Sequence, residues 1–265
     1  MIPAVMPTVG HRSRVVGISW RARMKTNRTV VVTGAAGGMG SVVVHRFLGN
    51  GDNVVATDTK REALDKLGEA DRLVIVEGDI SDEASCRDVA ETARKKFGQV
   101  DVLVNVAGFF PIQPFLDMTA DDWRKVIDIN LTGTALMTKA VLPLMVGRGW
   151  GRIINIGSAS VYAGVPGQAH YVAAKAGVVG LTRSLSREFG RDGITVNLVA
   201  PGITVTKAVK ETFPAELLNE QIERRAIKRE ERPEDLAGTV FFLASPDADF
   251  VTGQSIIVDG GSMML

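Results

Sequence analysis

Tyr171 and Lys175 have side chains whose types and spacing suit acid–base catalysis. They lie four residues apart in the segment Ala169–Phe189, which has a helical pattern. Residues with this spacing share a helix face, with Cβ atoms about 5–6 Å apart. A tyrosine phenol has an unperturbed pKa of about 10, and a nearby ammonium would lower it toward the range that suits a proton acceptor. The pair predicts an acid–base centre, although the spacing is also typical of an ordinary contact on a helix surface.

Ser158 strengthens this interpretation. It follows the apolar run Arg152–Ile156 and precedes Tyr171 by 13 residues. Ligands of open parallel sheets bind at the carboxyl ends of the strands. A hydroxyl at that edge is placed to hold a substrate oxygen beside Tyr171, and the alternative is a plain serine in a turn at the end of a strand.

A second constellation is the glycine-rich segment from residue 34 to residue 40. The run Thr29–Thr33 leads directly into Gly34-Ala35-Ala36-Gly37-Gly38-Met39-Gly40, and a helical segment follows. Gly34 permits a tight turn, Gly38 leaves room for a pyrophosphate, and Gly40 lets the helix approach the strand. The free N–H groups and the positive end of the helix dipole would bind the phosphates. Between a strand and a helix, this turn predicts a dinucleotide site that includes Met39; the alternative is a packing turn without a ligand.

An acidic residue follows the second apolar run. Asp58 comes directly after Asn53–Thr57. A carboxylate there accepts hydrogen bonds from the ribose hydroxyls of NAD and repels the 2′-phosphate of NADP. Asp58 therefore favours NAD over NADP, a preference that the nearby Lys60 and Arg61 would soften.

These residues lie in a chain that alternates short apolar runs with longer periodic segments. The runs predict seven strands: Thr29–Thr33, Asn53–Thr57, Leu73–Val76, Val102–Asn105, Arg152–Ile156, Thr195–Val199 and Ser255–Val258. The periodic segments predict helices over Met39–Asn50, Lys60–Leu67, Asp82–Phe97, Asp121–Val146, Ala169–Phe189 and Pro233–Leu243. Nearly continuous apolar strands separated by helices indicate an α/β fold, a single Rossmann-type doubly wound parallel sheet of seven strands flanked by helices.

Two segments depart from this alternation. Residues 203–232 are polar and charged, and an insertion after a strand of such a sheet is expected to form a substrate lid with one or two short helices. A solvated surface helix is the alternative. Residues 1–26 carry five lysine or arginine residues and no acidic residue, and they predict a flexible basic extension. The domain itself is expected to span residues 27–265.

The composition narrows the class of protein further. Basic and acidic residues number 31 and 30, so the total charge of +1 predicts neither a nucleic-acid nor a membrane partner. The single cysteine, Cys86, forms no internal disulfide, which favours a reducing, cytoplasmic location. The three histidines are scattered, so no metal site is expected.

Several independent motifs, in order along the chain from Thr29 to the C-terminus, resemble the classical short-chain dehydrogenases/reductases. The matching pieces are Thr33-Gly34-x-x-x-Gly38-x-Gly40, Gly78-Asp79-Ile80, Asn105-Val106-Ala107-Gly108, Asn130, Ser158, Tyr171-x-x-x-Lys175, Pro201-Gly202, Thr252-Gly253-Gln254 and Asp259-Gly260-Gly261. One departure is Val106, where the family usually has a second asparagine, so no side-chain hydrogen bond is expected from that position.

The resemblance implies a role for each matching residue. Tyr171 would be the acid/base, Lys175 would lower its pKa and bind the nicotinamide ribose, and Ser158 would orient the substrate oxygen. Asn130 would hold a water that links Lys175 to solvent. Further coenzyme contacts are implied for Asp79, Ile80, Asn105, Gly108, Pro201, Gly202 and Ile203.

The resemblance also implies a homotetramer. The helices expected over Asp121–Val146 and Ala169–Phe189 would pair across one dimer interface. The last strand and the apolar end of the chain, Met263-Met264-Leu265, would form the other.

The substrate pocket is expected to be mainly apolar. Phe110 and Tyr162 would line it, beside Ser158 and Tyr171. The resulting hypothesis is hydride transfer between NAD(H) and a small hydrophobic or aromatic secondary alcohol or ketone. A 3-oxoacyl-thioester reductase acting on acyl carrier protein is the alternative enzyme, which Asp58 and the balanced charge disfavour. A non-catalytic NAD-binding sensor is the alternative of another class, and it would be expected to lack Tyr171 or Lys175.

Overall fold

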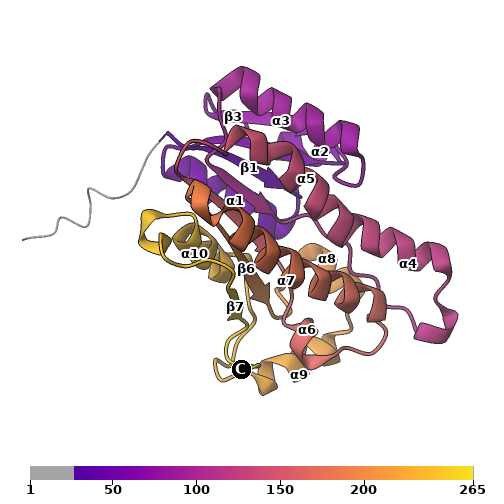
Figure 1. Cartoon of the computed structure of the whole chain (residues 1–265). Helices are drawn as coiled ribbons and strands as arrows, with labels where there is room; N and C mark the ends of the chain where they lie inside the picture. The colour runs from indigo at the N-terminus through magenta and orange to yellow at the C-terminus, as the bar shows by residue number, and fades with distance from the viewer. Residues whose placement is uncertain (1–26, 265) are drawn as a thin grey trace, which may run out of the picture.

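The computed structural model describes residues 27–264, and the predicted N-terminal extension, residues 1–26, lies outside them. The described chain forms one parallel sheet of seven strands in the order β3-β2-β1-β4-β5-β6-β7 (Figure 1). The strands are β1 Thr29–Thr33, β2 Asn53–Asp58, β3 Leu73–Glu77, β4 Val102–Asn105, β5 Gly151–Ile156, β6 Ile194–Pro201 and β7 Ser255–Val258. The predicted fold class is confirmed, and each strand agrees with its prediction to within two residues at either end.

Helices cover both faces of the sheet. They are α1 Gly38–Gly49, α2 Arg61–Leu64, α3 Glu83–Phe97, α4 Ala120–Ile127, α5 Gly133–Val141, α6 Ser160–Ala163, α7 Ala169–Phe189, α8 Lys207–Thr212, α9 Ala215–Arg224 and α10 Pro233–Leu243. Successive side chains of a strand point to opposite faces. Val30 and Val32 therefore pack with α1 and α10, whereas Val31 packs with α3 and α5. This alternation explains why the strands are apolar throughout.

The prediction of one helix over Asp121–Val146 is wrong. The segment contains α4, a π-helical turn over Asp128–Thr132, α5, and a 3-10 turn over Leu142–Leu144. Asn130 explains the π turn, because its side-chain Nδ2 donates to the carbonyl of Val126 four residues earlier, at 2.9 Å. That carbonyl would otherwise accept an ordinary helix hydrogen bond. Pro143 has no N–H to donate, which explains the tightening at the end of the segment.

The insertion after β6 contains two short helices, α8 and α9, as the sequence predicts. Within residues 27–264, no helix is both long and apolar enough to cross a membrane. Over the same residues, no cluster of histidine, cysteine or acidic side chains is arranged to hold a metal ion.

Candidate active site

The candidate site lies at the carboxyl ends of β1 and β4, where the strand order reverses. Gly34 follows β1 with a φ of +61°, a conformation that favours glycine. A Cβ at Gly34 would lie 2.7 Å from the backbone of Ala107, in the loop after β4. The two loops therefore meet at the crevice where open α/β sheets bind ligands.

The glycine-rich turn holds the first strand and the first helix in close contact. A Cβ at Gly40 would lie 2.1 Å from the carbonyl oxygen of Gly34, and one at Gly38 would lie 2.8 Å from Thr206. The N-cap of α1 is Gly37, and no side chain caps the helix. The first N–H groups of α1 are therefore left to bind a phosphate. This arrangement fits the pyrophosphate of a dinucleotide.

Asp58 lies beside the same turn. Its carboxylate accepts hydrogen bonds from the backbone N–H of Ala36, at 3.1 Å, and of Lys60, at 3.4 Å. The side chain is partly exposed at the end of β2. It is thus placed where the ribose of an adenosine would follow a pyrophosphate bound at α1.

Tyr171, Lys175 and Ser158 converge at the carboxyl end of β5. The Lys175 ammonium lies 5.7 Å from the centre of the Tyr171 ring and donates to the carbonyl of Ile156 at 2.8 Å. Burial lowers the pKa of Lys175 to about 8. Burial also raises the pKa of Tyr171 to about 12, and a hydrogen bond from the Ser158 hydroxyl opposes that rise. The three groups can hold and move a proton at one substrate oxygen.

Asn130 is fully buried in the π turn, and its side chain holds the loop after β4, which lies beside Lys175. Its amide donates to the carbonyl of Phe109 at 2.8 Å and accepts from the N–H of Phe109 at 3.2 Å. A Cβ at Gly108 would lie 3.0 Å from Asn130 Oδ1 and 3.6 Å from Lys175 Nζ. Asn130 and Lys175 therefore face the same space beneath Gly108. Both N–H bonds of the Asn130 amide are used by the backbone, so only oxygen atoms of this residue remain for a water.

The other predicted coenzyme residues differ in what their side chains do. Asp79 is exposed, and it accepts from the backbone and hydroxyl of Ser81. Ile80 is buried in the core beside α3 and α5. The Asn105 amide donates to Thr138 and Asn155 inside the molecule, so this side chain ties β4 to α5 and β5 rather than facing the crevice.

Met39 lies in the first turn of α1, where it is partly buried and packs against the hydrophobic core. Pro201 ends β6, and Gly202 and Ile203 follow it into the insertion. A Cβ at Gly202 would lie 2.8 Å from the carboxylate of Glu231. The segment after β6 is therefore held close to the far end of the insertion.

One aromatic ring contacts the ring of Tyr171, and a second ring stacks on the first. Phe110 meets the Tyr171 ring edge-on, with centroids 6.5 Å apart, and stacks on Phe213 at the same centroid distance. Phe213 was not singled out from the sequence, although it is the sole aromatic residue among residues 203–232. Tyr162 packs instead on the cluster of Val178, Val179, Leu198 and Ala200.

A buried polar cluster closes the base of the insertion, and the sequence did not reveal it. Thr204 pairs with Glu231 in a β-bridge and donates its hydroxyl to Glu231 at 2.6 Å. Arg225 lies 3.6 Å from the same carboxylate and donates to the carbonyl of Ile203 at 2.9 Å. Glu231 and Arg225 are 4% and 3% exposed, so both side chains are removed from water. The cluster fixes the two ends of the insertion to each other.

Glu231 is expected to make the stability of the protein depend on pH. Burial raises the pKa of Glu231 to about 7, above the value of about 4.3 of a free glutamate. The folded state therefore holds a proton that the unfolded chain has lost, and stability falls as the pH rises from about 4.5 through 7. We expect Glu231→Gln to remove this loss. Between pH 4.5 and 8, the unfolding free energy of the variant is expected to rise relative to that of the wild type by up to about 3 kcal/mol.

Urea unfolding at pH 4.5, 6 and 8 measures this difference. Parallel curves of stability against pH for wild type and Glu231→Gln would contradict the prediction. Because Arg225 keeps its bonds to two backbone carbonyls in either case, the variant is expected to fold.

Comparison with known proteins places the chain in a family. A family model described as enoyl-(acyl carrier protein) reductase matches residues 34–263. A solved structure from Brucella melitensis, described as a short-chain dehydrogenase/reductase, glucose/ribitol dehydrogenase, superposes with a TM-score of 0.87 at 36% identity, over 92% of this chain and 99% of that one. The chain belongs to the short-chain dehydrogenase/reductase family, and it is an oxidoreductase that acts on CH–OH groups.

Two curated relatives show the range of activities among similar proteins. A 2,3-dihydroxy-2,3-dihydro-p-cumate dehydrogenase of Pseudomonas putida is 41% identical over 247 residues, 90% of this chain and 95% of the relative. A 3-oxoacyl-[acyl-carrier-protein] reductase of Synechocystis is 39% identical over 246 residues, 90% of this chain and 98% of the relative. Similarity of this degree shows the family. The substrate has to be inferred from the residues of the site.

Proposed function

We propose that this protein transfers a hydride between NAD(H) and a small hydrophobic or aromatic secondary alcohol or ketone. The observation that carries the proposal is the position of the Tyr171 phenol. Ser158 lowers its pKa, the Lys175 ammonium lies 5.7 Å from the centre of its ring, and the ring of Phe110 flanks it. An acid–base pair beside an apolar wall suits the oxidation of a compact apolar alcohol.

Each residue of the site has a defined part in this reaction. Tyr171 takes the proton of the alcohol, and Ser158 donates a hydrogen bond to the same oxygen. Lys175 stabilises the phenolate, and Asn130 holds the loop of Phe109 and Gly108 against Lys175. The coenzyme, when bound, accepts or gives the hydride. The first turn of α1, with Asp58, would hold its pyrophosphate and ribose; Gly108, Asp79 and Ile80 on one side and Pro201 to Ile203 on the other would complete that site.

Asp58 supports NAD as the coenzyme. A carboxylate held beside the glycine-rich turn repels a 2′-phosphate and accepts from the ribose hydroxyls. We expect kcat/KM to be at least tenfold higher with NAD than with NADP, and we expect Asp58→Ala to reduce that ratio. Steady-state kinetics with both coenzymes on one alcohol measures it. A clear preference for NADP in the wild type would refute the assignment of NAD.

The rings of Phe110 and Phe213 support a ring-bearing substrate, and one similar protein is named for a dihydrodiol of an aromatic acid. The insertion that carries Phe213 would be the substrate lid. We expect Phe213→Ala to raise KM for ring-bearing secondary alcohols about fivefold, the value of one lost aromatic contact, and to change KM for a short acyclic alcohol much less. A panel of alcohols and one 3-oxoacyl thioester tests the substrate class. Turnover of the thioester alone would favour the alternative, a 3-oxoacyl-thioester reductase.

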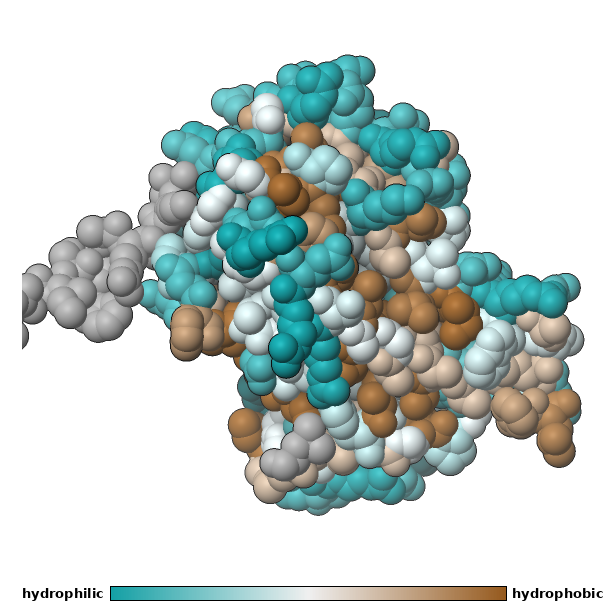
Figure 2. Space-filling model, viewed as in Figure 1, coloured by the Kyte–Doolittle hydropathy of each residue, from teal (hydrophilic) through white to brown (hydrophobic). Residues whose placement is uncertain are grey.

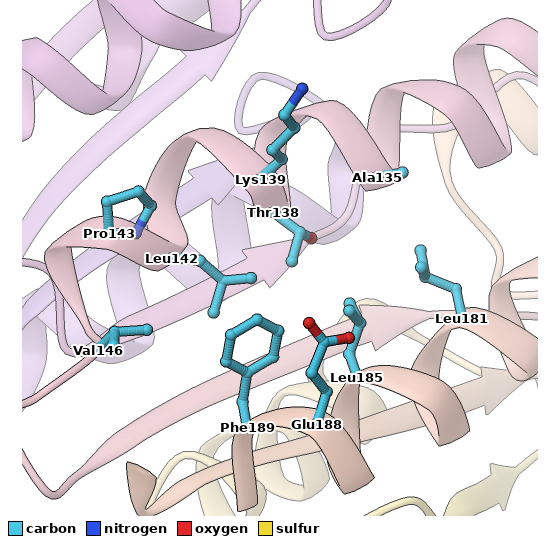
Figure 3. A pocket seen from close by; sticks show the side chains of 10 residues that line it. All are labelled: Ala135, Thr138, Lys139, Leu142, Pro143, Val146, Leu181, Leu185, Glu188 and Phe189. Carbon is cyan, nitrogen blue, oxygen red and sulfur yellow. The ribbon is translucent and has the colours of Figure 1, made fainter.

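A homotetramer in the cytoplasm is the proposed form of the protein. An apolar groove of about 600 Å³ runs between α5 and α7, with Leu142 and Lys139 on one side and Leu185, Glu188 and Phe189 on the other (Figure 3). Hydrophobic residues also gather over these helices on the surface (Figure 2). A second copy related by a two-fold axis would bury this groove and bring the unlike charges together. Light scattering is expected to give a mass of four chains, and Leu185→Glu is expected to lower it.

A further inference from the structure

Ser160 binds the oxygen of Ser158 twice. The backbone N–H of Ser160 donates to Ser158 Oγ at 3.2 Å, and the hydroxyl of Ser160 donates to the same atom at 2.8 Å. A serine hydroxyl has two lone pairs and one hydrogen. Both lone pairs of Ser158 are therefore occupied, and its hydrogen is the part that remains for another partner.

The partner of that hydrogen is an oxygen in the candidate active site. The Ser158 hydroxyl acts on the Tyr171 phenol and lowers its pKa, against the effect of burial. The three hydroxyls thus form a chain, in which Ser160 donates to Ser158 and Ser158 acts on Tyr171. Hydrogen bonds in such a chain polarise one another.

We propose that Ser160 is a positioning residue that fixes Ser158 as a hydrogen-bond donor to the reacting oxygen. The inference rests on the proposed function and adds to it a residue that acts through Ser158. Without the Ser160 hydroxyl, the Ser158 hydroxyl regains a free lone pair and can turn to accept a bond. It then stabilises negative charge on the phenol or on the substrate oxygen less well. Ser160 lies at the start of α6, a helix of four residues, and is partly exposed.

Ser160→Ala keeps the backbone N–H and removes the hydroxyl. We expect kcat to fall about tenfold, the equivalent of one lost hydrogen bond of about 1.4 kcal/mol. We expect KM to change by less than about twofold, and the apparent pKa of the pH–rate profile to rise. Ser160→Thr restores a hydroxyl at the same position, and we expect it to recover most of the rate.

A double variant separates positioning from a second, independent role. If Ser160 acts through Ser158, then Ser158→Ala/Ser160→Ala has the same kcat as Ser158→Ala alone, because the target of the Ser160 hydroxyl is gone. Additive losses would overturn the proposal. An unchanged kcat and pH profile in Ser160→Ala would also overturn it.

A measurement without substrate distinguishes failure of this inference from failure of the proposed function. The chain has two tyrosines, so labelling of the tyrosine ζ-carbon gives two NMR signals, and Tyr162→Phe assigns them. At pH 7 we expect Ser160→Ala to shift the Tyr171 signal in the same direction as Ser158→Ala does, whereas Ser160→Thr leaves it near the wild-type position. This result supports the hydroxyl chain even if no alcohol is turned over, and an unshifted signal in Ser160→Ala contradicts it.

Discussion

Tyr171→Phe is expected to lower kcat by about 10²–10⁴-fold, the usual contribution of a general acid or base. The substitution removes one oxygen atom and keeps the ring that meets Phe110 edge-on. The variant is therefore expected to fold and to bind NAD with a Kd within about threefold of the wild type. A loss in kcat without a loss in binding is typical of a group that acts in the transition state.

The measurement is kcat in the wild type and the variant over pH 6–10, together with NAD binding by calorimetry. In the structure, burial holds the pKa of Tyr171 at about 12 and that of Lys175 at about 8. Oxidation of an alcohol needs the phenolate, so the wild-type rate is expected to rise with pH. The residual rate of Tyr171→Phe is expected to lack this rise, because the variant has no phenol to ionise. An active variant with the wild-type pH profile would reject Tyr171 as the acid/base.

Gly40→Ala is expected to be the most damaging single-methyl change in the glycine-rich turn. A Cβ at this position would lie 2.1 Å from the carbonyl oxygen of Gly34 and 2.8 Å from the Cα of Ala35. Both neighbours are backbone atoms of the turn itself, so they cannot move aside without opening it. We expect a loss of stability of about 3 kcal/mol or more and a loss of NAD binding of at least tenfold.

Gly49→Ala is the matched control, because it lies in the same helix and its Cβ would meet nothing within 4 Å. Alanine is favoured over glycine in a helix by roughly 0.5–1 kcal/mol, so this variant is expected to be as stable as the wild type or slightly more stable. Thermal unfolding and calorimetric binding of NAD compare the two variants. Equal stability and equal binding in Gly40→Ala and Gly49→Ala would contradict the prediction, because they would show that α1 can move away from the glycine-rich turn without loss.

The features that the sequence predicted are those that short segments encode. A strand buried on both faces must be apolar at every position, as Val30, Val31 and Val32 are, so the strands could be found one by one. The order of strands and helices along the chain then leaves few topologies. Gly40 was found because the close approach that it allows is to Gly34 and Ala35, a few residues earlier in the chain.

The features that the sequence missed depend on residues far apart in the chain. Phe213 stacks on Phe110, about a hundred residues earlier in the chain, and the residues next to Phe213 in the sequence do not indicate this contact. Glu231 looked like one more charge in a charged segment, and its burial follows from contacts with Thr204 and Arg225. The π turn was hidden because Asn130 fits a helical pattern, and the bonds between its side chain and Phe109, 21 residues earlier, are visible only in three dimensions.

The π turn also limits how the chain can change in length. Successive residues of a helix are rotated by about 100° about its axis. One deletion within Asp128–Thr132 would therefore rotate α5, which follows the turn, by this angle relative to α4, which precedes it. Asn130 would then lose its bonds to Phe109, or α5 would turn its buried face away from α3. Substitutions at positions other than Asn130 can be absorbed one at a time in this segment, whereas insertions and deletions cannot. Homologous chains should therefore align across it without gaps even where they share few of its amino acids.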